Sequence, residues 1–208
     1  MTPVFYSFRR CPYAMRARLA LLSSGVGVDL REIVLRDKPV AFLEASDSAT
    51  VPCLVHADGT IDESLDIMKW SLSQNDPDGW LDMPPEGWDW ITRADGPFKE
   101  ALDRTKYQTR YPDSNAVAQR EFAAAFLRDL DTQIHAWMFD RPSIADFAIL
   151  PFVRQFAFID KNWFDAQSWS NLQAWLDNFL GSARFEAIML KYSKWKPGES
   201  SIQFPTRL

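Results

Sequence analysis

The order of elements in the first 75 residues constrains the fold of this chain more than any other feature. Residues 3–8 are mostly β-branched or aromatic, and residues 28–34 begin with alternating apolar and polar side chains, so both segments are expected to form strands. Between them, apolar residues recur at helical spacing from Met15 to Leu22, and Gly25 ends the helix. Because a helix joins the two strands, we expect them to be parallel.

The rest of this half predicts a second helix, a hairpin and a third helix. We expect these elements at residues 39–46 (helix), 51–56 and 60–62 (strands) and 64–72 (helix). Asp58-Gly59 is a strong hairpin-turn pair, so the last two strands should be antiparallel. The resulting order, βαβαββα, is that of a thioredoxin-like α/β domain, which we place at residues 1–75.

The composition changes after this domain. Residues 76–87 are rich in Pro, Gly and Asp and are typical of a linker. Ser143 and Asp146 have the spacing of a capping box at a helix start. No strand pattern stands out past the linker, so an all-α domain is expected over residues 88–208. Its clearest helices are expected near 115–139, 143–158 and 169–190.

Charge and composition argue against several classes of function. The net charge is −5, and basic and acidic residues are mixed along the chain, which is not the pattern of a nucleic-acid-binding protein. No secretory signal is visible, and no apolar run approaches the roughly 18–20 residues of a membrane span, so a cytoplasmic protein without membrane contact is expected. With two cysteines and two histidines in unrelated contexts, neither a disulfide framework nor a metal site is expected.

Cys11 is the sharpest chemical feature of the sequence. It lies between the first strand and the first helix, where unpaired backbone N–H groups and the helix dipole favour negative charge. Arg9, Arg10 and Arg16 add a positive field nearby. Such surroundings lower the pKa of a thiol and populate the nucleophilic thiolate, although a small buried core cysteine is the plainer alternative.

The position three residues after Cys11 holds Ala14, so the thiol has no local partner with which to close a disulfide. A disulfide formed on Cys11 must then be opened by an external thiol. This favours glutathione chemistry over exchange between protein dithiols.

Two further motifs lie in the same domain. Val51-Pro52 falls at the start of the third strand, where a cis-proline in a thioredoxin-like domain faces the cysteine and leaves the backbone of Val51 able to pair with a peptide-like ligand. An ordinary trans proline is the alternative. Glu63-Ser64 precedes a helix, where an acid suits an ammonium, and a hydroxyl with helix N–H groups suits a carboxylate. Plain helix capping would also explain this pair.

The segment from Phe5 to Ala14 resembles the N-terminus of omega-class and related cysteine-type glutathione transferases. The resemblance implies a glutathione-transferase fold with Cys11 as catalytic residue. It also implies that Lys38, Val51-Pro52, Glu63-Ser64 and the flanking Tyr13 bind glutathione. Ser143 to Phe147 and Pro151-Phe152 resemble the capping-box helix of that family, so the likeness covers nearly the whole chain. One departure is Ser46 to Thr50, where many relatives carry a Pro-Lys-Gly or Pro-Phe-Gly turn.

On this resemblance we expect a glutathione-dependent thiol transferase or reductase, acting through a Cys11–glutathione mixed disulfide. A small hydrophobic or disulfide acceptor is expected as second substrate, no metal is expected, and the family predicts a homodimer. Two alternatives remain open: a conventional transferase that conjugates glutathione to electrophiles, and a non-catalytic interaction protein of the RNA-polymerase-associated type.

Three other residues carry predictions. Tyr6 is expected to pack in the first strand, because Cys11 takes over the catalytic position that a tyrosine or serine occupies in other glutathione transferases. Cys53 should be a buried structural thiol, with a role as resolving thiol for Cys11 as the alternative. Trp195 should line the acceptor pocket, as a C-terminal tryptophan does in the cysteine-type family, or else anchor the tail.

Overall fold

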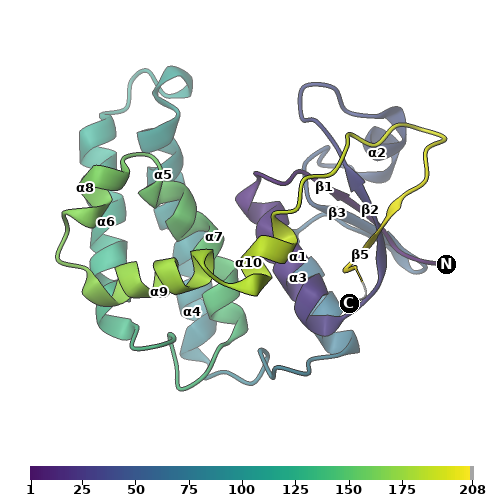
Figure 1. The fold of residues 1–208 in the computed structure, drawn as a ribbon. Helices are drawn as coiled ribbons and strands as arrows, with labels where there is room; N and C mark the ends of the chain where they lie inside the picture. Colours follow the sequence, from purple (N-terminus) through teal and green to yellow (C-terminus); the bar gives the residue numbers. More distant parts are fainter. Residues whose placement is uncertain (207–208) are drawn as a thin grey trace. The chain divides into compact units, whose positions relative to one another are not determined.

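The elements predicted for the first 75 residues are all present in the computed structural model, which describes residues 1–206 (Figure 1). They are β1 (Val4–Ser7), α1 (Pro12–Ser24), β2 (Val28–Glu32), α2 (Val40–Ala45), β3 (Cys53–His56), β4 (Gly59–Ile61) and α3 (Ser64–Gln74). β1 and β2 are parallel, and β3 and β4 form the antiparallel hairpin. The thioredoxin-like prediction is therefore confirmed.

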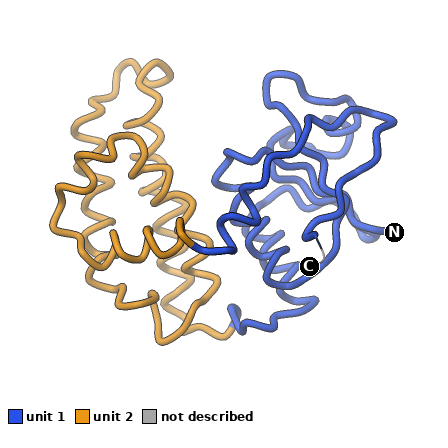
Figure 2. Tube along the Cα trace, viewed as in Figure 1, with its two compact units in different colours: residues 1–81, 182–208 blue, residues 82–181 orange. Residues whose placement is uncertain are grey.

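A fifth strand, β5 (Ile202–Phe204), was not indicated by the sequence. It pairs antiparallel with β2 at the edge of the sheet, whose strand order is β4-β3-β1-β2-β5. The chain divides into a sheet unit, residues 1–81 with those from Ser182 onward, and a helical unit, residues 82–181 (Figure 2). The predicted all-helical region is thus wrong at its C-terminal end. A three-residue strand is too short to show an alternation of apolar and polar residues in the sequence. It is a strand because it pairs with the free edge of β2.

Local chemistry explains where α1 begins and ends. Pro12 occupies its first turn, where the missing N–H costs nothing, and Gly25 closes it at φ 68°, a conformation that glycine adopts without strain. Most of the helix is buried, including the side chains of Arg16 and Arg18. Because a buried guanidinium needs partners, these two arginines must bond across the fold.

The helical unit contains seven helical segments of α or π type within its described residues. They are α4 (Glu86–Arg93), a π-helical turn (Ala94–Phe98), α5 (Lys99–Lys106), α6 (Ala116–Gln133), α7 (Ile144–Ala157), α8 (Lys161–Asp165) and α9 (Ser170–Leu180). The helix predicted at 169–190 is interrupted. α9 ends at Leu180 with Gly181 as its C-cap, and Ser182 caps a separate helix, α10 (Ala183–Ile188), by accepting a hydrogen bond from Phe185 N–H.

The predicted capping box starts α7. Asp146 is fully buried, and its carboxylate accepts hydrogen bonds from the backbone N–H and hydroxyl of Ser143, the backbone N–H of Met138 and the indole of Trp175. One carboxylate therefore joins the start of α7 to α9 and to the preceding loop.

Within residues 1–206, no helix combines the length and apolar character needed to cross a bilayer.

Candidate active site

Cys11 is the N-cap residue of α1, with extended backbone angles (φ −76°, ψ 123°), and its side chain makes no capping hydrogen bond. The thiol is partly buried. Its Sγ lies 3.6 Å from the carbonyl oxygen of Val51, to which the thiol donates. The strand–cysteine–helix arrangement predicted from the sequence is present, and the sulfur of Cys11 lies beside the Val51-Pro52 segment.

The Val51–Pro52 peptide bond is cis, as predicted. Val51 is only 7% exposed, and its backbone N–H has no hydrogen-bond partner within the described residues. A nearly buried N–H beside the Cys11 thiol is suited to donate to the carbonyl of a peptide-like ligand.

Glu63 and Ser64 begin α3. Glu63 is the N-cap residue; its side chain is exposed and makes no capping hydrogen bond. Ser64 is buried, and its hydroxyl accepts a 2.9 Å hydrogen bond from the guanidinium of Arg16. That guanidinium also lies 5.2 Å from the ring centroid of Tyr13.

Arg16 therefore links the cysteine motif to the Glu63-Ser64 motif, a role that the sequence did not assign to it. From its position in the sequence, Arg16 was expected only to add to the positive field around Cys11. The apolar residues on either side of it, Met15 and Ala17, could have indicated that Arg16 is buried. A buried arginine requires a specific hydrogen-bond acceptor.

The other two arginines near Cys11 have contacts of their own. The side chain of Arg9 donates to the carbonyl of Met189 at 3.3 Å, which ties the cysteine loop to the C-terminal segment. Arg10 is exposed and lies 5.3 Å from the ring centroid of Phe8. Lys38 lies in the loop before α2, partly buried, and its side chain forms no hydrogen bond or ion pair within residues 1–206. Its contact with a ligand remains a prediction.

Trp195 is 7% exposed and lies in a buried cluster with Tyr6, Val51 and Cys53, against which Cys11 also packs. The guanidinium of Arg31 lies 4.2 Å from the ring centroid of Trp195. The backbone N–H of Trp195 donates to the carbonyl of Glu32 at 2.8 Å. These contacts favour the anchoring alternative, and the acceptor-pocket role stays a prediction.

Tyr6 is 2% exposed, as expected for a residue packed in β1. Its hydroxyl accepts a hydrogen bond from Arg31 at 2.6 Å and lies 3.4 Å from the carbonyl of Ala41.

The predicted departure at Ser46 to Thr50 forms a turn held by its own hydroxyls. Ser48 Oγ lies 2.8 Å from the hydroxyl of Thr50 and 3.3 Å from that of Ser46. Ala49 has φ 52°, in the left-handed region that favours glycine, at the place where many relatives carry a glycine-containing turn.

Cys53 is fully buried on β3, and both cysteines are present as thiols. Burial, with a smaller contribution from Asp62, raises the pKa of the Cys53 thiol to about 12. At pH 8 only about one part in 10⁴ of this thiol is then ionised. We predict that iodoacetamide alkylates Cys11 in the native protein and reaches Cys53 only after unfolding in urea. Peptide mass spectrometry checks this; equal alkylation of both thiols without urea would contradict it.

Among residues 1–206, no group of three or more His, Cys, Asp and Glu side chains is placed to hold a metal ion. The site thus consists of a thiol at a helix N-terminus, a backbone edge at Val51 and a second helix N-terminus at Ser64. This combination, in a thioredoxin-like domain followed by a helical unit, is the arrangement that the sequence analysis expects of a glutathione-transferase fold.

Comparison with known families identifies the chain. Residues 5–80 match the model of the glutathione S-transferase N-terminal domain, and residues 89–178 match that of the glutathione S-transferase C-terminal domain. The protein belongs to the glutathione S-transferase family.

Two curated proteins are similar in sequence. A "Probable glutathione transferase" of Aplysia californica is 40% identical over 57 residues, which cover 27% of this chain and 62% of that protein. "Glutathione S-transferase U22" of Arabidopsis thaliana is 24% identical over 211 residues, covering 96% of this chain and 88% of that protein.

Solved structures share the fold. Glutathione transferase Omega 3C from Trametes versicolor has a TM-score of 0.76 at 16% identity, covering 93% of this chain and 91% of its own. A glutathione transferase from Pseudomonas putida, solved with one glutathione disulfide bound per subunit, has a TM-score of 0.76 at 17% identity and covers 90% of each chain. At such identities the likeness establishes the fold alone.

Proposed function

We propose that this protein is a glutathione-dependent thiol transferase in which Cys11 is the nucleophile. The observation that carries the proposal is the Cys11 thiol at the N-terminus of α1, 3.6 Å from the Val51 carbonyl and with Ala14 in place of a second cysteine. The helix N-terminus favours a thiolate, and the missing partner leaves glutathione to complete the cycle.

The reaction runs in two exchanges. The Cys11 thiolate attacks the glutathionyl sulfur of a mixed disulfide, forms a Cys11–glutathione disulfide and expels the acceptor as a thiolate, which takes up a proton. A second glutathione, as thiolate, then attacks the glutathionyl sulfur on Cys11. Glutathione disulfide leaves, and Cys11 returns as a thiolate. The net change is reduction of the acceptor disulfide and oxidation of glutathione.

The proposed binding residues are those that the family resemblance implies, and the geometry of Val51 and Ser64 supports two of them. The backbone of Val51, beside the cis Pro52, is placed to pair with the peptide part of glutathione. Ser64 and the first amides of α3 suit a carboxylate, and Glu63 suits an ammonium. On the family resemblance, we also propose that Tyr13 flanks the ligand and that Lys38 contacts it. A P. putida relative with glutathione disulfide bound supports glutathione as the ligand. The homodimer and the cytoplasmic location remain predictions.

The experiment is a pair of steady-state assays on the purified protein. One follows reduction of a glutathione mixed disulfide, and the other follows conjugation of glutathione to chlorodinitrobenzene. The proposal expects the first rate to dominate. Conjugation alone would favour the conventional transferase, and neither activity, with no retention on immobilised glutathione, would favour the interaction protein.

Glutathione affinity should depend on Glu63. Glu63→Ala removes the partner of the ligand ammonium, which costs about 1.5–3 kcal/mol for a charge-assisted hydrogen bond, so the Kd should rise about 10–100-fold. Because the side chain of Glu63 is exposed, we expect the rise in Kd to lie near the lower end of this range, at about tenfold. Lys38→Ala should raise the Kd less, by about two- to fivefold. Isothermal calorimetry measures both, with Glu44→Ala, an exposed acid on α2, as the control. An unchanged Kd for Glu63→Ala would remove Glu63 from the site.

A further inference from the structure

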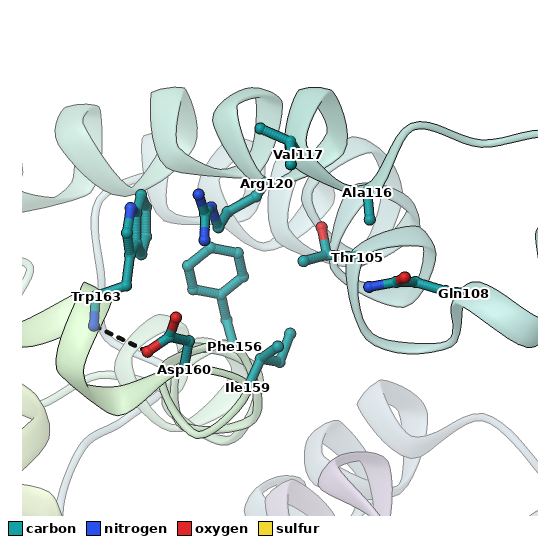
Figure 3. A pocket seen from close by; sticks show the side chains of 9 residues that line it. All are labelled: Thr105, Gln108, Ala116, Val117, Arg120, Phe156, Ile159, Asp160 and Trp163. Atoms are coloured by element: carbon teal, nitrogen blue, oxygen red, sulfur yellow. Dashed lines mark hydrogen bonds between the residues drawn. The ribbon is translucent and has the colours of Figure 1, made fainter.

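A cavity of about 240 Å³ lies within the helical unit, between α5, α6 and the end of α7 with the following α8 (Figure 3). It is lined by Thr105, Gln108, Ala116, Val117, Arg120, Phe156, Ile159, Asp160 and Trp163. All of these residues belong to the helical unit, whereas every residue proposed to bind glutathione belongs to the sheet unit. The cavity therefore needs an explanation of its own.

Arg120 is the cationic side chain that lines this cavity. Its Nε is buried and has no hydrogen-bond partner, and the side chain forms no ion pair within the described residues. Its guanidinium lies 4.5 Å from the ring centroid of Trp163. Stacking on an indole holds a guanidinium in place while its edge keeps N–H donors for an acceptor in the same plane. A buried donor without an acceptor is costly, so this edge is suited to an anion.

Asp160 limits which anion fits. It is the N-cap residue of α8 and accepts a 3.0 Å hydrogen bond from Trp163 N–H through Oδ1, drawn as the dashed line in Figure 3. Its second oxygen is not used in that bond, and its negative charge opposes a second anionic group in the cavity. A ligand with one carboxylate and one hydroxyl donor would satisfy both Arg120 and Asp160.

The remaining walls favour a flat ring. Phe156 is 3% exposed, and Ile159, Ala116 and Val117 add aliphatic surface. The volume lies below the range of about 300–1,000 Å³ that drug-sized ligands occupy, which suits a ligand with a single ring. Aromatic walls contact such a ring through stacked or edge-to-face geometry.

We propose that this cavity is a second ligand site, separate in sequence and in unit from the glutathione residues, that binds a single-ring aromatic carboxylate carrying a hydroxyl group. The carboxylate meets the edge of Arg120, the ring lies against Phe156 and Ile159, and the hydroxyl donates to Asp160.

The test is calorimetric titration of the full chain with 4-hydroxybenzoate. Saturable binding is expected. Arg120→Met keeps an unbranched apolar stem but removes the guanidinium and its charge, and it should weaken binding by about tenfold or more. Arg128→Met is the matched control: it lies on the same helix, is exposed and pairs with Glu121 at 3.8 Å, so it should change the Kd by less than about twofold.

A second variant and a second probe keep the test independent of how Arg120→Met folds. Val117 is 62% exposed, so Val117→Trp should fold normally, as a thermal melt can verify, and should block the cavity and abolish binding. The neutral 4-hydroxybenzamide should bind at least about tenfold more weakly than the carboxylate. No saturable binding of 4-hydroxybenzoate, equal affinity for the amide, or unchanged binding by the folded Val117→Trp protein would each overturn the proposal.

Discussion

Cys11→Ser is expected to lower the rate of mixed-disulfide reduction by about 10³-fold or more. A serine hydroxyl cannot form a disulfide with the glutathionyl sulfur, so the covalent intermediate is lost. The hydroxyl can still donate a hydrogen bond to the glutathione thiolate at the N-terminus of α1. Glutathione affinity should therefore stay within a few-fold, and conjugation of chlorodinitrobenzene should be retained or rise, because bound glutathione is then the only nucleophile in the site.

Two matched variants make this result specific. Cys11→Ala should lose disulfide reduction without gaining conjugation, because a methyl group offers no hydrogen bond to the thiolate. Cys53→Ser changes the buried thiol on β3 and should keep the reduction rate if the variant folds. Steady-state kinetics with a glutathione mixed disulfide measure all three. A Cys11→Ser protein that retains the wild-type reduction rate would show that Cys11 is not the nucleophile.

Arg18→Met is expected to lower the free energy of unfolding by about 3–5 kcal/mol, because it breaks a buried ion pair by removing one partner. The Arg18 side chain is 0% exposed. It forms a short ion pair with Glu32, donates to the hydroxyl of Ser7 at 2.8 Å and donates to the carbonyl of Ile188 at 3.0 Å. Burial lowers the pKa of Arg18, and the Glu32 carboxylate opposes that shift.

Urea unfolding measures this loss, and Arg141→Met provides the control. Arg141 pairs with Asp82 on the surface, where the two side chains are 49% and 84% exposed, so its loss should cost less than about 1 kcal/mol. Arg18 also holds α10, so the segment that follows Ile188 should become more sensitive to limited proteolysis in Arg18→Met. A loss of stability no larger than that of Arg141→Met would contradict this account of the buried network.

The parts of the fold that could be predicted are those that local sequence determines. Only four residues, with Cys11 the last, separate the first strand from a helix that starts at Pro12, so the position of Cys11 at the helix N-terminus could be predicted from neighbouring residues. The Asp58-Gly59 hairpin and the Ser143–Asp146 capping box are equally local, and both are present. In both motifs, residues a few positions apart are enough to predict the local backbone conformation.

The parts that could not be predicted depend on contacts between distant segments. The hydrogen bond from Arg16 to Ser64 joins residues 48 positions apart, and β5 pairs with β2 across most of the chain. The residues around Ile202 show no strand pattern. This segment is a strand because it pairs with β2, which is far away in the sequence. In the sequence, Arg120 is likewise an ordinary arginine of an amphipathic helix. Its contact with Trp163 of α8 could be found only in the structure.

The central claim, that Cys11 carries the glutathionyl group during turnover, is tested most directly by peptide mass spectrometry of the protein trapped with a glutathione mixed disulfide. The account predicts one glutathione adduct, on Cys11, that forms at least as fast as turnover and disappears when free glutathione is added. An internal Cys11–Cys53 disulfide, or steady turnover with no adduct on Cys11, would contradict it.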